Sequence, residues 1–430
     1  MLALVLALQA AVSSGPPDSL PRVTLTEALQ RAARLDPNYV AAQGQVDNAA
    51  WARRNAFTAF VLPSVAIGAN LQKTNPAQFF FTNKIIQVDQ TWTAQLIARY
   101  DVFTGGQKFA ELSRSGAALA GAHADELRQR FATAELTESD YYAVLANTEL
   151  DRVARERLRR AQEQLSVARA RVLSGAAVST DSLNLRLELA RAQVGQLQQE
   201  SALRVSRLQL GRRIGAAGPV DAAPLDTAAA PELPISLADA IAEAARQGPE
   251  YRVAAANERA ASAAYRYELG NYLPHAALTL NAVALDTLFY PSFFKQSTLT
   301  LGISFPIWNN GQRELNLSRA RTIKNVARAT REDMDRAVLP DVTAAYDAYE
   351  TARASAVVAR DAQTVARENF RVQQTRYSAG ATTILDLITS QVALSEADAA
   401  RVQAEYSRRL ALAGLETILG RRLFSDKGTP

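Results

Sequence analysis

Residues 62–72 read LPSVAIGANLQ, and the period of the hydrophobic pattern changes to two directly after the Leu62-Pro63 step. Apolar side chains at 65, 67, 69 and 71 alternate with polar or small ones at 64, 68, 70 and 72. This alternation is typical of a β-strand with one apolar and one polar face. A second step, Leu273-Pro274, precedes a similar run at 278–282, so the pattern occurs twice.

Two further runs with period two cover residues 92–102 and 298–305, and each ends shortly before a Gly-Gln step. We therefore predict two strands in each half of the chain. Their expected bounds are about 62–75 and 90–104 in the first half, and about 273–287 and 297–308 in the second.

Aromatic side chains gather near the ends of these runs. At the loop end they are Phe79, Phe80, Phe81, Trp92, Phe289, Tyr290, Phe293 and Phe294; at the other end they are Phe103, Phe305 and Trp308. Strands of about 9–11 residues between aromatic girdles are typical of a membrane β-barrel. The alternative is a small soluble sheet with one face in water.

Four strands cannot close a barrel, and an open sheet would leave unpaired edge amides in hydrocarbon. Several chains must then contribute strands to one barrel. We predict a homotrimer with a twelve-stranded barrel that lies in lipid.

Outward from the strands, the chain is an internal duplication with an offset of 205–212 residues. Five ordered matches support it: Leu25–Pro37 with Leu237–Pro249, Leu62-Pro63 with Leu273-Pro274, Phe103–Gln107 with Trp308–Gln312, Arg171, Gly175 and Asp181 with Arg376, Gly380 and Asp386, and Leu210–Arg213 with Leu419–Arg422. The fold class is therefore mainly α with a membrane β-barrel contribution, in which each repeat contains a helix, a β-hairpin and a pair of long coiled helices.

The expected helices cover 24–60, 107–172 and 181–213 in the first repeat, and 236–272, 312–377 and 385–422 in the second. Apolar positions in the long helices alternate three and four apart, as in coiled coils. The repeats span 22–213 and 236–424, joined by a Pro/Ala-rich linker at 214–235 and followed by a tail at 425–430. Residues 1–13 begin with the apolar run MLALVLALQAAV and are expected to be a signal peptide.

Composition excludes several classes of protein. The chain has no cysteine and two isolated histidines, His123 and His275, so we expect no thiol chemistry, no metal site and no cofactor. The sequence contains no catalytic or phosphate-binding motif, and we therefore expect that the protein is not an enzyme. The net charge of +5 comes with interspersed acidic residues, which does not indicate nucleic-acid binding.

With these duplicated halves, the chain resembles the outer-membrane efflux protein family, the TolC-like channels. The resemblance covers about residues 25–423 and implies a homotrimer whose outer-membrane barrel continues into a periplasmic α-helical tunnel. It implies the passive exit duct of a tripartite efflux pump or a type I secretion system, working with a periplasmic adaptor protein and an inner-membrane transporter. The alternative is a periplasmic coiled-coil scaffold without a membrane barrel.

The resemblance also implies functional residues at the two glycine turns. Gly175 and Gly380 correspond to the periplasmic tip where adaptor hairpins dock. Thr180, Asp181 and Tyr377 match a polar network that gates the tip, whose arginine is replaced here by Thr382.

Asp386 matches the outer of two acidic rings in the pore, while Thr389 occupies the inner ring position. Structural explanations exist for each of these residues. The glycines also suit helix C-caps, the aspartates suit helix starts, and Tyr377 also continues an apolar stripe.

Overall fold

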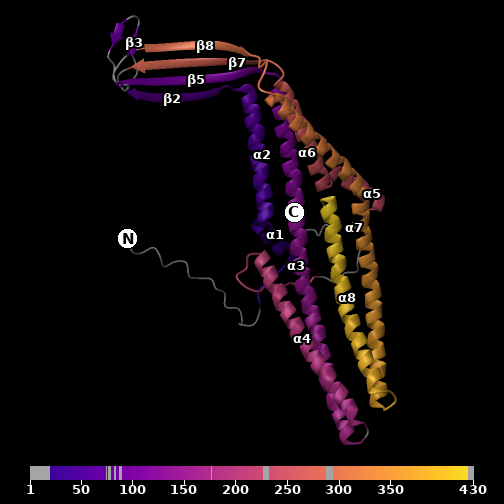
Figure 1. Ribbon diagram of the computed structural model, residues 1–430. Helices are drawn as coiled ribbons and strands as arrows, with labels where there is room; N and C mark the ends of the chain where they lie inside the picture. The colour runs from indigo at the N-terminus through magenta and orange to yellow at the C-terminus, as the bar shows by residue number, and fades with distance from the viewer. Residues whose placement is uncertain are drawn as a thin grey trace, which may run out of the picture. The chain divides into compact units, whose positions relative to one another are not determined.

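The computed structural model describes residues 20–73, 75, 79–81, 84–86, 90–175, 177–225, 232–286 and 294–424 (Figure 1). The expected signal peptide and the tail lie outside the described residues. The chain forms two compact units. Unit 1 comprises Met1–Ala41, Leu127–Ala244 and Val338–Pro430, and unit 2 comprises Ala42–Glu126 and Ala245–Ala337. Each unit takes segments from both repeats, so the units do not coincide with the repeats.

The first expected helix of each repeat is two helices, which corrects the sequence prediction. The first repeat has α1 (Leu25–Leu35) and α2 (Pro37–Val61), and the second has α5 (Leu237–Gln247) and α6 (Pro249–Gly270). Proline disfavours the helical conformation of the residue before it. Asp36 is extended, with ψ of 118°, and Gly248 has ψ of 130°, so both prolines begin a new helix.

Four long helices follow the same order in both repeats: α3 (Gln107–Leu173), α4 (Ser179–Arg213), α7 (Gln312–Ser378) and α8 (Ile384–Leu419). In unit 1 they share one apolar cluster. Its buried members are Leu165, Ala168, Leu185, Phe370, Tyr377, Ile384, Leu387 and Leu394. We call the parts of α3, α4, α7 and α8 that lie in unit 1 the helix bundle.

The segment expected to be a linker is partly structured, which corrects the prediction at 214–235. Strand β6 (Asp221–Ala222) pairs in parallel with β1 (Arg22–Val23). Val220 and Ala222 are buried against α3 in a second apolar cluster, where the Tyr141 hydroxyl donates to the carbonyl oxygen of Ala223 at 2.7 Å. The alanine and proline content concealed this short pairing.

Unit 2 contains a four-stranded antiparallel sheet in the order β2-β5-β7-β8. The strands are β2 (Ser64–Lys73), β5 (Gln90–Thr104), β7 (His275–Asp286) and β8 (Phe294–Ser304). Each repeat supplies one hairpin, and the hairpins join through β5 and β7. Strands β3 (Phe79–Phe81) and β4 (Lys84–Ile86) form a separate pair. Within a single chain, β2 and β8 are the edges of this sheet.

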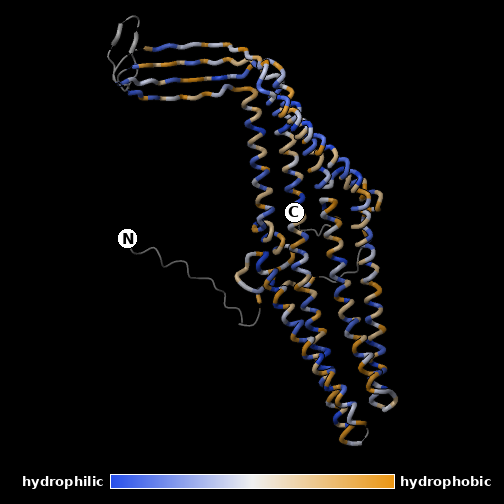
Figure 2. The backbone as a smooth tube through the Cα atoms, in the orientation of Figure 1, coloured by the Kyte–Doolittle hydropathy of each residue, from blue (hydrophilic) through white to orange (hydrophobic). Residues whose placement is uncertain are grey.

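One face of the sheet is mainly apolar, with Ser297 and Lys295 of β8 as polar exceptions. Residues paired on neighbouring strands share a face, and two such rows are Val65–Ala98–Leu280–Leu299 and Ile67–Leu96–Ala282–Ser297. Ile67 is 83% exposed and Leu299 is 65% exposed. The opposite face carries polar rows such as Ser64–Arg99–Thr279–Thr300, and Figure 2 shows the alternation along the strands.

Aromatic residues near the strand ends are partly described. Phe103, Phe305 and Trp308 are exposed. Phe289, Tyr290 and Phe293 lie outside the described residues, as do the side chains of 79–81. In the described part of the chain, no helix has both the length and the apolar character needed to cross a bilayer.

Candidate functional site at the two glycine turns

Both helical hairpins of the helix bundle end in a turn built on a glycine with positive φ. Gly175 has φ of 75° and Gly380 has φ of 76°, a region that favours glycine. At the second turn the Gly380 amide donates to Tyr377 at 3.0 Å and the Ala381 amide donates to Arg376 at 2.8 Å. This is the Schellman motif that ends a helix. The matching Gly175 amide donates to Val172 at 3.1 Å.

Tyr377, at the end of α7, connects the two turns. Its side chain is buried, and its hydroxyl donates to Asp181 Oδ2 at 3.4 Å. Burial, and then the nearby Asp181 carboxylate, raise the pKa of Tyr377 above its ordinary value. The phenol therefore keeps its proton, which the hydrogen bond to Asp181 requires. The structure thus brings together two of the three residues expected to gate the tip.

Thr180 is not part of this contact. It lies beside Asp181 in the first turn of α4 with an exposed side chain, and its hydroxyl makes no hydrogen bond to the described residues. Its match to the family pattern therefore has no counterpart in the geometry of a single chain.

Arg171 is a residue at this site to which the sequence assigned no role. Its guanidinium lies over the Tyr377 ring, with Cζ 4.9 Å from the ring centroid, and its Nη1 donates to the Tyr377 carbonyl oxygen. The repeat alignment contained a signal, because Arg171 matches Arg376. It did not indicate that Arg171 would reach the other repeat.

Asp386 completes a capping box at the start of α8. Its Oδ2 accepts from the Thr383 hydroxyl at 2.6 Å, the Thr382 hydroxyl at 2.9 Å and the Thr383 amide at 3.2 Å. The Thr383 hydroxyl in turn accepts from the Asp386 amide at 3.2 Å. These hydrogen bonds, from Thr383 first and then Thr382, hold the pKa of Asp386 below its ordinary value. The carboxylate is exposed and charged, and it also begins the helix.

Buried charges connect the helices of the bundle away from the turns. Arg157 of α3 donates to the buried Glu188 of α4 at 2.6 Å, and Gln363 of α7 donates to Asp398 of α8 at 2.6 Å. Arg160 of α3 also lies 4.0 Å from Asp398 of α8. This ion pair links the hairpin of α3 and α4 to the hairpin of α7 and α8.

A second buried ionic cluster surrounds Arg422. Its guanidinium contacts Glu138 of α3 at 2.5 Å and Glu416 of α8 at 2.6 Å. Burial raises the pKa of Glu138, although Arg422 opposes this shift. Among the residues that the structure describes, no group of three or more histidine, aspartate or glutamate side chains could hold a metal ion.

Comparison with known proteins gives three kinds of match. The family model described as outer membrane efflux protein matches residues 240–421. The pyoverdine export outer membrane protein OpmQ of Pseudomonas putida is 28% identical over an alignment of 359 residues, and the match covers 79% of this chain and 72% of that protein.

Solved structures match nearly the whole chain. The CmeC outer membrane channel of Campylobacter jejuni has a TM-score of 0.80 with 14% identity, covering 94% of this chain and 87% of that one. The outer membrane protein VceC of Vibrio cholerae has a TM-score of 0.77 with 16% identity, covering 93% of this chain and 97% of that one. The chain is thus similar to outer membrane efflux proteins over residues 240–421, and it has the fold of the solved outer membrane channels.

Proposed function

We propose that this protein is the outer-membrane exit duct of a tripartite efflux pump, formed by three copies of the chain. It lies in the outer membrane, extends into the periplasm and conducts cargo passively. An efflux pump is favoured over a type I secretion system because the matching family model is named for efflux and the Pseudomonas putida relative for export of pyoverdine.

The observation that carries this proposal is the sheet, which has one mainly apolar, exposed face and, within a single chain, the two edge strands β2 and β8. In a soluble scaffold, a patch of exposed apolar side chains such as Ile67 and Leu299 would lie unfavourably in water. In lipid the same face is favourable, but the edge amides of β2 and β8 must be paired. Three copies, each pairing β8 with β2 of the next, close twelve strands without an edge.

A second observation supports several copies in the periplasmic region. Helix α4 buries one face in its own chain, including Leu185, Ala192 and Leu203. Its opposite face is an exposed apolar stripe, which we call the α4 stripe: Leu183, Leu187, Val194, Leu197, Val205 and Leu208. The spacings of three, four, seven and eight residues place the stripe on one side of the helix, as in a coiled coil.

Helix α7 carries a matching surface. Val358, Val365 and Val372 are seven residues apart and exposed, and they form what we call the α7 stripe. Exposed carboxylates, Asp361 and Glu368, flank it, whereas exposed arginines such as Arg186 and Arg191 flank the α4 stripe. We infer that the α4 stripe of one copy packs against the α7 stripe of the next, which makes a ring.

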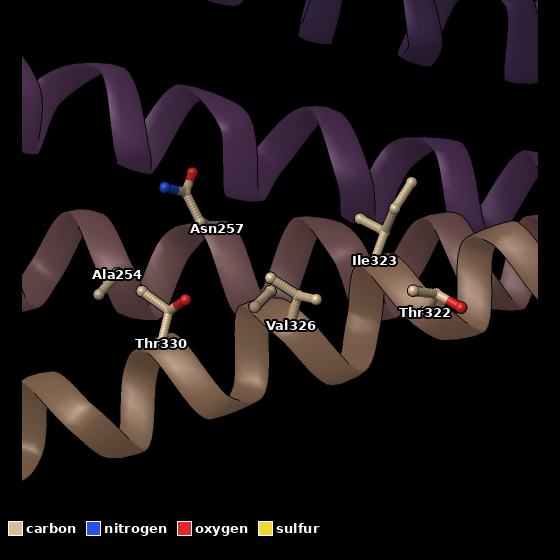
Figure 3. Close-up of a pocket in the computed structure, with 7 residues that line it drawn as sticks. Ala254, Asn257, Thr322, Ile323, Val326 and Thr330 are labelled. Carbon is tan, nitrogen blue, oxygen red and sulfur yellow. The ribbon is translucent and has the colours of Figure 1, made fainter.

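Unit 2 has a further surface of this kind. Ala254 and Asn257 of α6 and residues of α7 line an open pocket of about 340 Å³ (Figure 3). Ile323 and Val326 in its wall are both 60% exposed. A side chain of a neighbouring copy is the occupant that this apolar lining favours.

The two glycine turns are the proposed docking site for a periplasmic adaptor, which joins the duct to an inner-membrane transporter. A Cβ added to Gly175 would meet no other atom within 4 Å, so this turn is open to a partner. Replacement of Gly175 or Gly380 by a bulky residue is expected to abolish export and to leave the trimer and membrane insertion intact. Normal export by such a variant would refute the docking site.

Tyr377 and Asp181 are proposed to gate the tip, with Thr180 contributing only in contact with another copy. Three Asp386 carboxylates are proposed to form an acidic ring in the pore. Like charges around a narrow axis raise one another's pKa, while the Thr383 and Thr382 hydroxyls act in the opposite sense.

Outer-membrane fractionation combined with planar-bilayer recording tests the function. We expect a heat-modifiable oligomer in the outer-membrane fraction that forms conducting channels after purification. A protein found only in the soluble periplasmic fraction, without conductance, would instead indicate the scaffold.

A further inference from the structure

Both glycine turns have their glycine at positive φ, but the side-chain contacts of their described residues differ. With an offset of 205 residues, Arg171 matches Arg376, and both lie four residues before their glycine. Arg376 stays at its own turn, where Nη2 donates to the Ala381 carbonyl oxygen at 3.5 Å. Arg171 reaches the second turn, where it contacts the Tyr377 ring and carbonyl oxygen.

The residue that matches Tyr377 in the first repeat is Val172, which offers no aromatic face. An arginine stacks on an aromatic ring and donates in the plane of its guanidinium at the same time. Arg171 does both at Tyr377. Its Nη2 would also lie 3.6 Å from a Cβ added to Gly380, so the guanidinium lies directly against the second turn.

Asp181 differs from its match Asp386 in a complementary way. The Asp386 carboxylate accepts hydrogen bonds from the hydroxyls of Thr382 and Thr383. The residue that matches Thr383 is Val178, which caps α4 without a side-chain hydrogen bond. Asp181 therefore has no capping hydroxyl, and it accepts from the Tyr377 hydroxyl instead.

We infer that Arg171 is a positioning residue that holds the two helical hairpins of one chain together at their turns. With Asp181 and Tyr377 it forms a tip clasp, in which α3, α4 and α7 meet at one tyrosine. Position 382 in the second turn is a threonine, so Arg171 of the same chain is the residue that brings a guanidinium to the clasp. The clasp itself does not depend on the proposed function. Its expected consequence, that the resting channel stays closed, does rest on that function.

Distance measurement between two spin labels tests the clasp without any need for conduction. The chain has no cysteine, so Leu173→Cys and Ala379→Cys place one label on each turn at exposed positions. Labelled chains are diluted with unlabelled ones so that distances within a chain dominate. We expect a narrow distribution with Arg171 and a broader, longer one after Arg171→Ala. Arg376→Ala is the matched control and should leave the distribution narrow.

Conductance in planar bilayers is the second measurement. A cation–π contact and a charge-assisted hydrogen bond together correspond to a change of about tenfold in the ratio of open to closed channels. Arg171→Ala should therefore raise the resting open fraction about tenfold. Arg171→Lys should recover only part of the closed state, because lysine can donate to the carbonyl oxygen but has no planar face.

Double variants separate the clasp from a general loosening of the turn. Tyr377→Phe keeps the ring and carbonyl oxygen for Arg171, so its effect should add to that of Arg171→Ala. Tyr377→Val removes the ring, so Arg171→Ala should then have a smaller effect. An unchanged distance distribution in Arg171→Ala would overturn the inference. A wild-type protein without conductance but with a narrow distribution would refute the proposed function and leave the clasp intact.

Discussion

The sheet of unit 2 and the helix bundle of unit 1 both leave apolar side chains exposed in a single chain, but they differ in what lies behind them. The bundle has a core of its own, with Leu185 and Tyr377 buried between four helices. The sheet has one layer, and Ile67 on its apolar face is among the most exposed apolar residues of the described chain. A single layer of strands has no second layer to cover that face.

This difference indicates two different environments. The apolar face of the sheet requires a surrounding that is apolar everywhere, which lipid provides. The bundle needs only narrow apolar partners, because the α4 stripe and the α7 stripe are each one line of exposed apolar residues on a helix whose other side is packed in its own chain. Substitutions at the sheet should therefore depend on the membrane, and those on the stripes should depend on assembly.

The largest effect is expected for a charge on the apolar face of the sheet. Ile67→Lys should destabilise the inserted barrel by about 2–4 kcal/mol per chain, because lysine must lose its hydration near the middle of the strand. Unfolding from lipid vesicles by urea measures this. Gln95→Lys is the matched control, since it lies at the same height on the opposite face. Equal loss in both variants would contradict a lipid-facing surface.

A comparable effect is expected inside the bundle. Arg422→Met leaves Glu138 and Glu416 buried without their cation, and should lower the free energy of unfolding by about 2–4 kcal/mol at neutral pH. Thermal unfolding followed by circular dichroism measures the loss. It should be the same in detergent and in lipid, unlike the loss in Ile67→Lys.

The pH dependence of this variant has a definite sign. The pKa of Glu138 is already raised by burial, and removal of Arg422 removes an opposing influence. A carboxyl with a raised folded-state pKa binds protons more readily in the folded state, so stability rises as pH falls toward that pKa. The loss of unfolding free energy in Arg422→Met, relative to wild type, should therefore become smaller below neutral pH. A loss that does not change with pH would contradict the burial of Glu138.

A smaller effect is expected on the α4 stripe. Leu187→Ala should weaken assembly by about 1 kcal/mol per chain, since a half-exposed leucine loses only part of its burial there. Analytical ultracentrifugation in detergent measures the dissociation. Leu185→Ala, two residues away on the buried face, should instead lower the unfolding temperature. If Leu187→Ala changed only the unfolding temperature, the stripe would be no interface.

The smallest effect is expected at Asp386. Its lowered pKa keeps it ionised to lower pH than an ordinary carboxyl, so its contribution to the helix start should be present at neutral pH and lost as pH falls through that pKa. In planar bilayers, Asp386→Ala should reduce the block by polyvalent cations. Unchanged conductance and block would leave Asp386 as a helix-capping residue only.

Local patterns in the sequence were enough to predict the strands and the long helices. The alternation after Leu62-Pro63 and Leu273-Pro274 corresponds to β2 and β7, because side-chain direction in a strand depends only on neighbouring residues. The Asp36-Pro37 and Gly248-Pro249 steps also contained a local signal, and they end α1 and α5. A continuous helical pattern on both sides concealed these breaks.

Contacts between the repeats could not be predicted in this way. The pairing of β5 with β7 joins segments far apart in the chain, and the burial of Val220 and Ala222 depends on α3. Arg171 and Arg376 have equivalent places in the sequence, yet only one crosses to the other turn. Their different contacts depend on Val172 and Tyr377, which matter only once the two turns lie side by side.

The mass of the complex extracted from outer membranes in mild detergent tests the central claim most directly. Closure of β2 and β8 without an edge predicts one species of three chains, stable at the concentrations of native mass spectrometry. A stable monomer or dimer that retains its strands would contradict the account, because four or eight strands from these chains would then exist without the proposed twelve-stranded closure.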